Sequence, residues 1–259
     1  MKNNKLQAFD RLLNVMDELR EKCPWDKKQT FESLRSNTIE ETYELCDALL
    51  GGNMDTIKKE LGDVLLHVVF YARIASETNS FDISDVCNVL CDKLIYRHPH
   101  IFGDVSVSDS KQVMENWEML KLKEKDGNKS VLSGVPTSLP ALVKAQRIQE
   151  KARSAGFDWD EREQVWDKVR EELGELQNEV NRLNEQEMEA EFGDLLFSIV
   201  NAGRLYGINP ETALERTNRK FISRFTLMEE KVKERGLSLK NMTLDEMETL
   251  WCEAKRELS

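Results

Sequence analysis

Five carboxylates in two short clusters are the residues of this chain whose types and spacing best suit chemistry. The first cluster contains Glu171, Glu172 and Glu175, and the second, which begins after fifteen further residues, contains Glu191 and Asp194. Residues three and four apart on a helix share a face, so a helical hairpin would bring four or five carboxylates together. Each like-charged pair about 4 Å apart costs about 1 kcal/mol in water and about 4 kcal/mol at an effective dielectric of about 20. A fold that gathers such a group needs a cation among them.

The side chains narrow the identity of that cation. Both clusters offer oxygen ligands only, which hard divalent ions prefer. We therefore predict Mg²⁺ as the cofactor, with Mn²⁺ as a substitute. A di-iron carboxylate bundle would use Glu-x-x-His, and neither Glu-x-x-Asp of this chain has a histidine at that place. We therefore reject that class.

The same acidic pattern occurs a second time, 131 residues earlier in the chain. A Glu-Glu-x-x-Glu run beginning at Glu40 is again followed, after fifteen residues, by Glu-x-x-Asp. A chance run of charge would not reproduce both the residue types and the gap, so we infer an internal duplication. The second candidate site consists of Glu41, Glu44, Glu60 and Asp63.

Basic and aromatic residues accompany each acidic pattern at helical spacing. In the later copy, Lys168 lies one turn before the first cluster, and two further pairs lie four apart: Lys220 with Arg224, and Trp251 with Lys255. Cations beside a metal cluster suit a polyphosphate. A Trp with a Lys one turn later suits a nucleobase, because the indole stacks on the ring and the ammonium donates to it. Matching pairs in the earlier copy are Lys93 with Arg97 and Trp117 with Lys121.

Each of these residues also has an ordinary structural interpretation. Alone, Trp251 would be a core residue, and Lys220 and Arg224 would belong to a solvated face. Lys168 alone would pair with a glutamate on its own helix. Their joint recurrence beside the acidic repeat favours a nucleotide site, although duplication copies structural residues too.

The composition excludes several classes of protein. The net charge of the 259 residues is −11 and no Lys/Arg block occurs, which argues against binding of duplex nucleic acid. The five cysteines are an odd number without a CxxC pair, so we expect no disulfide scaffold and a cytoplasmic location. The longest apolar run, 64–72, is too short to span a membrane.

The periodicity predicts an all-α chain of two tandem helical bundles, without convincing strands. Asp, Gly, Ser and Pro residues concentrate between 125 and 140, which indicates a linker. We therefore expect an N-terminal domain at 1–125, a linker at 126–140 and a C-terminal domain at 141–259. The expected helices lie at 6–21, 34–50, 54–77, 82–97, 110–123, 141–153, 165–183, 186–206, 210–235 and 244–258.

The two acidic patterns resemble the motif of the MazG family of nucleoside triphosphate pyrophosphohydrolases: Glu-Glu-x-x-Glu, a gap, then Glu-x-x-Asp. Cys23-Pro24-Trp25-Asp26, followed by Gln29-Thr30, and Arg97-His98-Pro99-His100 are similar to further motifs of the two-domain bacterial form. The resemblance covers essentially the whole chain. It implies an all-α, Mg²⁺-dependent homodimer that cleaves nucleoside triphosphates between the α- and β-phosphates, mainly in the C-terminal unit.

The resemblance also implies roles for particular residues. The catalytic group would be Glu171, Glu172 and Glu175. The metal ligands would be Glu172, Glu175, Glu191 and Asp194. The substrate would be held by Lys168, Glu171, Lys220, Arg224, Trp251 and Lys255.

The N-terminal copy departs from this pattern in two places. Asn37 stands where the later copy has Lys168, and the stretch 93–117 is seven residues shorter than 220–251. We therefore hypothesise that the N-terminal domain is structural or weakly active.

The predicted function is hydrolysis of ribo- and deoxyribonucleoside triphosphates to monophosphate and pyrophosphate, with broad base specificity, in the housekeeping of nucleotide pools. Glu171 is the candidate general base, since its direction differs from that of Glu172 by about 100° on a helix. A purely supporting role for Glu171 stays open. The alternatives are a nucleotide-sensing or interaction module with a vestigial site, and acidic faces that are merely solvated.

Overall fold

The computed structural model describes residues 2–123, 130–159 and 161–258, and every regular element in these ranges is helical. The all-α prediction is confirmed. The chain divides into two compact units, Met1–Val113 and Met114–Ser259. The division falls inside helix α6 (Ser110–Lys123). Residues 126–129, the start of the expected linker, lie outside the described residues, and 130–140 contain no helix or strand.

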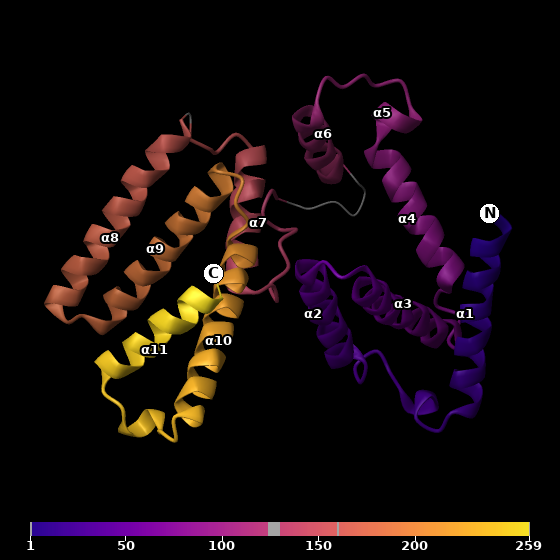
Figure 1. Cartoon of the computed structure of the whole chain (residues 1–259). Coiled ribbons are helices and arrows are strands. Elements are labelled where there is room, and N and C mark those ends of the chain that lie inside the picture. Colours follow the sequence, from indigo (N-terminus) through magenta and orange to yellow (C-terminus); the bar gives the residue numbers. More distant parts are fainter. Residues whose placement is uncertain (1, 124–129, 160, 259) are drawn as a thin grey trace. The chain divides into compact units, whose positions relative to one another are not determined.

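The N-terminal unit is built around a hairpin of α2 and α3, which pack side by side (Figure 1). Gly52 ends α2 in the left-handed conformation, with φ of 72°, which a residue without Cβ adopts at little cost. Asn53 then caps α3 by accepting from the backbone N–H groups of Asp55 and Thr56. The elements of this unit are α1 (Lys2–Lys22), η1 (Asp26–Lys28), α2 (Arg35–Gly51), α3 (Met54–Ser76), α4 (Ile83–Arg97) and α5 (Pro99–Phe102).

The C-terminal unit repeats this hairpin in α8 and α9 and adds a second hairpin, α10 with α11 (Figure 1). Leu183 ends α8 with φ of 56°. Thr243 and Glu246 form a capping box that begins α11. The elements are α7 (Ala141–Ser154), η2 (Arg162–Gln164), α8 (Val165–Arg182), α9 (Glu185–Leu205), α10 (Pro210–Glu234), η3 (Leu239–Asn241) and α11 (Leu244–Glu257).

Each unit has a small hydrophobic core. Met16, Leu34, Val69 and Phe70 pack together in the N-terminal unit, and burial of each such side chain contributes about 1.5–3 kcal/mol. In the C-terminal unit the core joins α10 to α11 through Met228, Val232 and Leu250. No helix of the described chain is both long and apolar enough to cross a membrane.

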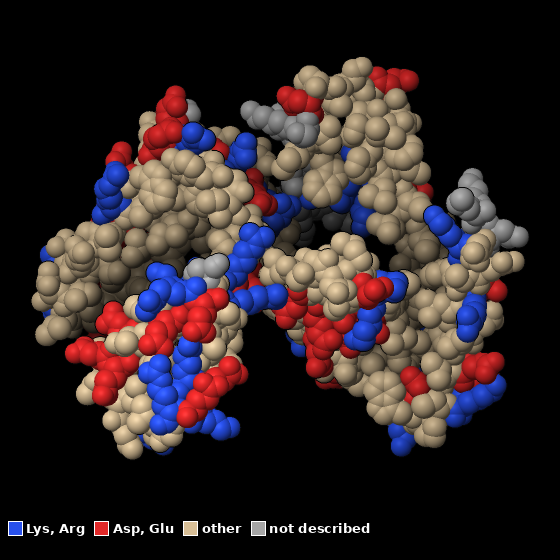
Figure 2. All heavy atoms as spheres, viewed as in Figure 1, with Lys and Arg blue, Asp and Glu red and all other residues tan. Residues whose placement is uncertain are grey.

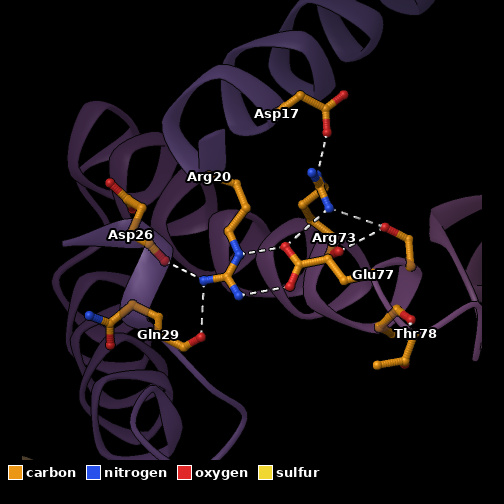
Figure 3. A network of polar contacts seen from close by, with 9 residues as sticks. Asp17, Arg20, Asp26, Gln29, Arg73, Glu77 and Thr78 are labelled. Atoms are coloured by element: carbon orange, nitrogen blue, oxygen red, sulfur yellow. Dashed lines mark hydrogen bonds and ion pairs between the residues drawn. The ribbon is translucent and has the colours of Figure 1, made fainter. Parts of the chain in front are cut away.

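A buried arginine fixes the loop between α1 and α2 (Figure 3). Arg20 donates to both carboxylate oxygens of Glu77, at 2.7 and 2.9 Å. It also donates to the backbone carbonyls of Asp26 and Gln29. Arg73 completes the network with ion pairs to Glu77 and Asp17. The loop that contains Cys23-Pro24-Trp25-Asp26 is therefore held against both α1 and α3.

The C-terminal unit fixes its equivalent loop with a related arginine. Arg204, 131 residues after Arg73, pairs with Asp158 and donates to the Asn201 amide oxygen. Arg153 approaches the same Asp158 carboxylate at 3.4 Å. Burial alone would raise the pKa of Asp158, but hydrogen bonds from Arg204 and the Trp159 backbone, with the charges of Arg204 and Arg153, lower it overall. Both arginines lie in the last turns of the second helix of their hairpin, so the anchor of the loop is part of the duplication.

Candidate functional site

Three carboxylates converge between α8 and α9 in the C-terminal unit. Glu172 and Glu175 lie one turn apart on α8, and Glu191 faces them from α9. One oxygen of each lies within 4.8 Å of the others. Glu172 is buried, Glu191 half-buried and Glu175 exposed, so the group is open to solvent on the Glu175 side. This geometry follows from the close packing of the two helices, which the turn at Leu183 permits.

Burial and mutual repulsion both raise the pKa values of Glu175 and Glu191. Desolvation and then the charge of Glu172 raise the pKa of Glu175. Desolvation, followed by the charges of Glu175 and Asp194, raises the pKa of Glu191. Three acidic oxygens held this closely fit a hard divalent ion, which would offset their repulsion.

The remaining acidic residues of the motif lie at the edge of this cluster. Asp194 is exposed, one turn after Glu191, and is outside the set whose oxygens lie within 4.8 Å. Glu171 is also exposed and bonds to Lys168 at 2.9 Å. Lys168 contacts Glu172 as well, at 2.7 Å, and the two glutamates together raise the pKa of Lys168. Lys168 therefore forms the intrahelical pairs that its spacing allows.

The predicted phosphate-binding cations lie on α10. Lys220 is exposed, and Arg224 is half-buried with its Nε atom shielded from solvent. That Nε atom has no hydrogen-bond partner among the described residues. Within the same described ranges, neither Lys220 nor Arg224 bonds to the carboxylates of α8 and α9. The structure therefore places these two groups of residues in one unit without joining them directly.

The predicted base-binding residues lie on α11. Trp251 is half-buried and packs against the core between α10 and α11. Its ring also meets Phe221, with centroids 5.0 Å apart, and Phe221 stacks on Phe225. Lys255 is exposed one turn later. Trp251 thus has a structural role in addition to any contact with a ligand.

The N-terminal unit contains a second cluster with the same construction. Glu41 on α2 and Glu60 and Asp63 on α3 bring oxygens within 4.8 Å of one another. Glu60 is only 5% exposed. Glu44 lies outside this set, although its charge contributes to a raised pKa of Glu41, after desolvation and Asp63. In each copy of the sequence pattern, three of the acidic side chains therefore converge.

Two features of the N-terminal cluster are not part of the acidic sequence motif. Lys59 bonds to Glu60 at 2.9 Å and reaches Asp63 at 3.5 Å. Beneath the cluster, Thr38 hydrogen-bonds to both His67 and Tyr71. A comparison of the two copies at the 131-residue offset would have shown that Ala190 stands opposite Lys59, whereas the Thr38 contacts depend on the fold.

The sequence is similar to a known family and to known proteins along most of its length. The family model described as the MazG nucleotide pyrophosphohydrolase domain matches residues 29–102 and 161–226, which include both clusters. The chain is 42% identical over 259 residues to the nucleoside triphosphate pyrophosphohydrolase of Escherichia coli (strain K12), covering 97% of this chain and 98% of that protein.

A second relative covers nearly the same extent. The chain is 47% identical over 250 residues to the nucleoside triphosphate pyrophosphohydrolase/pyrophosphatase MazG of Thermotoga maritima, covering 95% of each chain. Both relatives contain the two units along almost their whole length. This chain belongs to the MazG nucleotide pyrophosphohydrolase family.

Proposed function

We propose that the C-terminal unit hydrolyses ribo- and deoxyribonucleoside triphosphates to nucleoside monophosphate and pyrophosphate in the presence of Mg²⁺, with Mn²⁺ as a substitute. Family membership supports the reaction class. The observation that carries the assignment to this unit is the convergence of Glu172, Glu175 and Glu191 from two helices. No ammonium or guanidinium group of the described chain contacts Glu175 or Glu191, so these two remain available as ligands.

The three converging glutamates would hold the metal, together with Asp194 at the exposed edge. A bound Mg²⁺ supplies charge neutralisation and Lewis-acid polarisation of phosphoryl oxygens. The ion pair of 2.7 Å between Lys168 and Glu172 orients this carboxylate. The glutamate oxygens are thereby organised before a ligand arrives, which limits the cost of binding.

The reaction breaks the bond between the α-phosphorus and the oxygen that bridges to the β-phosphate. Water adds to the α-phosphorus, and pyrophosphate leaves with the electron pair of that bond. Glu171, exposed beside Glu172, would accept the proton from the attacking water. Lys220 and Arg224 would offset the charge that develops on the leaving pyrophosphate. The buried, unbonded Nε of Arg224 is a donor that a phosphate oxygen would satisfy.

Broad base specificity follows from the proposed base site. Trp251 offers an aromatic face, and stacking on such a face tolerates every base. Lys255 would donate to an acceptor on the base edge. Tolerance of this kind suits housekeeping of nucleotide pools.

A second copy of the chain is the proposed partner. The α8–α9 hairpin exposes the aromatic side chains of Phe192 and Phe197 and the aliphatic ones of Leu196 and Ile199. Figure 2 shows an extensive surface without charge over this hairpin. An uncovered apolar area of this kind marks an interface, and we propose that it pairs two protomers. Sedimentation equilibrium should give twice the mass of the chain, and a monomer at micromolar concentration would refute the proposal.

The decisive experiment measures pyrophosphate release across the nucleoside triphosphates, with and without Mg²⁺, for the wild type and Glu175→Ala. The variant should lose at least about 100-fold in turnover, because it removes a metal ligand, and it should stay folded because repulsion in the cluster falls. Glu189→Ala removes an exposed carboxylate from another face of α9 and is the matched control. Undiminished release by Glu175→Ala would defeat the assignment. Tight nucleotide binding without release in the wild type would instead support a sensing module.

A further inference from the structure

The two carboxylate clusters differ at the residue that precedes the α3 or α9 glutamate. In the N-terminal unit this residue is Lys59, whose ammonium lies 2.9 Å from Glu60 and 3.5 Å from Asp63. In the C-terminal unit the same position, 131 residues later, is Ala190. In the N-terminal cluster, Lys59 therefore pairs with two of the three carboxylates.

The N-terminal cluster nevertheless keeps an unsatisfied acceptor. Only 5% of the Glu60 surface is exposed. Within the described chain, its Oε2 atom has no hydrogen-bond partner. Lys59 contacts the other oxygen, Oε1. A buried carboxylate oxygen without a donor is costly. The cluster therefore keeps an acceptor that a second positive group would satisfy.

In the C-terminal unit, the lysine that neutralises the acidic residues lies on the other helix of the hairpin. Lys168 lies on the first helix of the hairpin and contacts Glu171 and Glu172. It leaves Glu175 and Glu191 free of cationic contacts within the described ranges. The N-terminal counterpart of Lys168 is Asn37. The duplication has therefore kept the carboxylates while the lysine stands on opposite helices of the two hairpins.

We propose that Lys59 is a tethered counter-ion that competes with a divalent cation for Glu60 and Asp63, and so confines tight metal binding to the C-terminal unit. This inference rests on the proposed metal-dependent function of the Glu172, Glu175 and Glu191 cluster. The ammonium neutralises part of the acidic charge and lies beside the oxygens that an incoming ion needs. The side chain is 66% exposed, so Lys59 weakens binding instead of blocking it completely.

The test is Mn²⁺ titration of the full-length chain, with free Mn²⁺ measured by electron paramagnetic resonance. The wild type should show one tight class of sites. Lys59→Ala should gain a second class, with affinity raised by about tenfold or more. Adding Glu191→Gln to Lys59→Ala should remove the original class and keep the new one, which assigns the new sites to the N-terminal unit.

Lys58→Ala is the matched control. Lys58 bonds to Asp55 at 2.6 Å, so its loss removes the same charge one residue away without uncovering the cluster. It should leave Mn²⁺ binding unchanged. Equal gains in the two lysine variants, no gain in Lys59→Ala, or two equally tight classes in the wild type would each overturn the proposal. Circular dichroism of every variant checks that the helices are retained.

The reciprocal variant Ala190→Lys places an ammonium beside Glu191. It should weaken the C-terminal class of Mn²⁺ sites by about tenfold, and an unaltered affinity would contradict the inference. A wild type that binds no Mn²⁺ would sink the proposed function, and the gain or absence of gain in Lys59→Ala would still decide the role of the lysine. The two ideas therefore fail separately.

Discussion

The α2–α3 and α8–α9 hairpins contain the same carboxylates but neutralise them differently. Lys59 lies on the second helix of its hairpin and contacts Glu60 and Asp63. Lys168 lies on the first helix of its hairpin and contacts Glu171 and Glu172. The two lysines therefore pair with different carboxylates of the repeated motif, which is the basis of the proposed difference in metal binding. Conservation of acidic residues within a duplicated chain does not by itself mean equal function.

The interiors beneath the two clusters also differ. In the N-terminal unit, the Thr38 hydroxyl lies 3.0 Å from the Leu34 carbonyl and is also hydrogen-bonded to His67 Nδ1 and the Tyr71 hydroxyl. The matching positions of the C-terminal unit are Val169, Ser198 and Ala202. A satisfied polar network is rigid and specific in geometry. This difference suits a structural role for the N-terminal hairpin.

The largest expected effect separates the two clusters by activity. Glu191→Gln should lower pyrophosphate release by at least about 100-fold, because an amide replaces a charged ligand. Glu60→Gln should lower it by less than about threefold, since Lys59 already offsets the charge of its cluster. Both variants are assayed at saturating Mg²⁺ with one nucleoside triphosphate. Comparable losses would show that the two units share the catalytic work.

Loss of the loop anchor in the N-terminal unit is the largest expected effect on stability. Arg20→Ala leaves Glu77 without its bidentate partner and the Gln29 carbonyl without a donor, whereas the Asp26 carbonyl keeps the Gln29 backbone N–H. Hydrogen bonds to charged groups contribute about 1.5–3 kcal/mol, so we expect the free energy of unfolding to fall by about 3 kcal/mol. Urea denaturation measures this loss. The control is Lys22→Ala, because Lys22 is exposed and forms only a surface pair with Glu18.

The fold and part of the site could be predicted from the sequence because their causes are local. Helical periodicity predicts α4 at 82–97, and the structure has Ile83–Arg97, where Pro99 prevents continuation. The spacing of the acidic motif likewise predicts which side chains share a helix face. It does not show that Glu172 is buried while Glu171 is exposed, because burial depends on the partner helix.

The contacts that the sequence could not reveal are long-range. Arg20 and Glu77 are 57 residues apart, and Arg20 also recognises backbone carbonyls, which carry no side-chain signal. Trp251 contacts Phe221 across two helices, a pairing that periodicity on either helix leaves undetermined. The sequence shows a lysine at position 59, but only the structure shows that its ammonium lies close enough to Asp63 to form an ion pair.

The raised pKa values predict how pH changes the C-terminal cluster. Desolvation and neighbouring charge hold the pKa of Glu175 and Glu191 above the ordinary value of 4.5. The folded, metal-free state therefore binds protons more tightly than the unfolded state. The stability that these two groups contribute is present below pH 4.5 and is lost as pH rises through their folded pKa values.

Addition of Mg²⁺ should reverse that loss at neutral pH, because the ion replaces the protons. We expect Mg²⁺ to raise Tm by an amount that grows as pH rises from about 5 to about 7.5, because the two carboxyl groups lose their protons and can then bind the ion. Glu191→Gln should flatten the dependence. A shift in Tm that is independent of pH in the wild type would contradict the assignment of these carboxylates as ligands.

The smallest expected effect concerns the polar network of the N-terminal hairpin. Thr38→Val introduces the residue type that the C-terminal unit has at Val169, and it removes the hydroxyl to which His67 and Tyr71 are hydrogen-bonded. Because His67 is buried and desolvation lowers its pKa, the neutral ring would lose the hydrogen-bond partner of its Nδ1 atom, at a cost of about 1–2 kcal/mol. Urea denaturation should show this loss, and pyrophosphate release should stay within about twofold of the wild type. Ser33→Ala, at an exposed position of the preceding loop, tests whether loss of any nearby hydroxyl has the same effect. If Thr38→Val lowered turnover as strongly as Glu191→Gln, the N-terminal hairpin would be coupled to catalysis, and the division of roles between the two units would have to be abandoned.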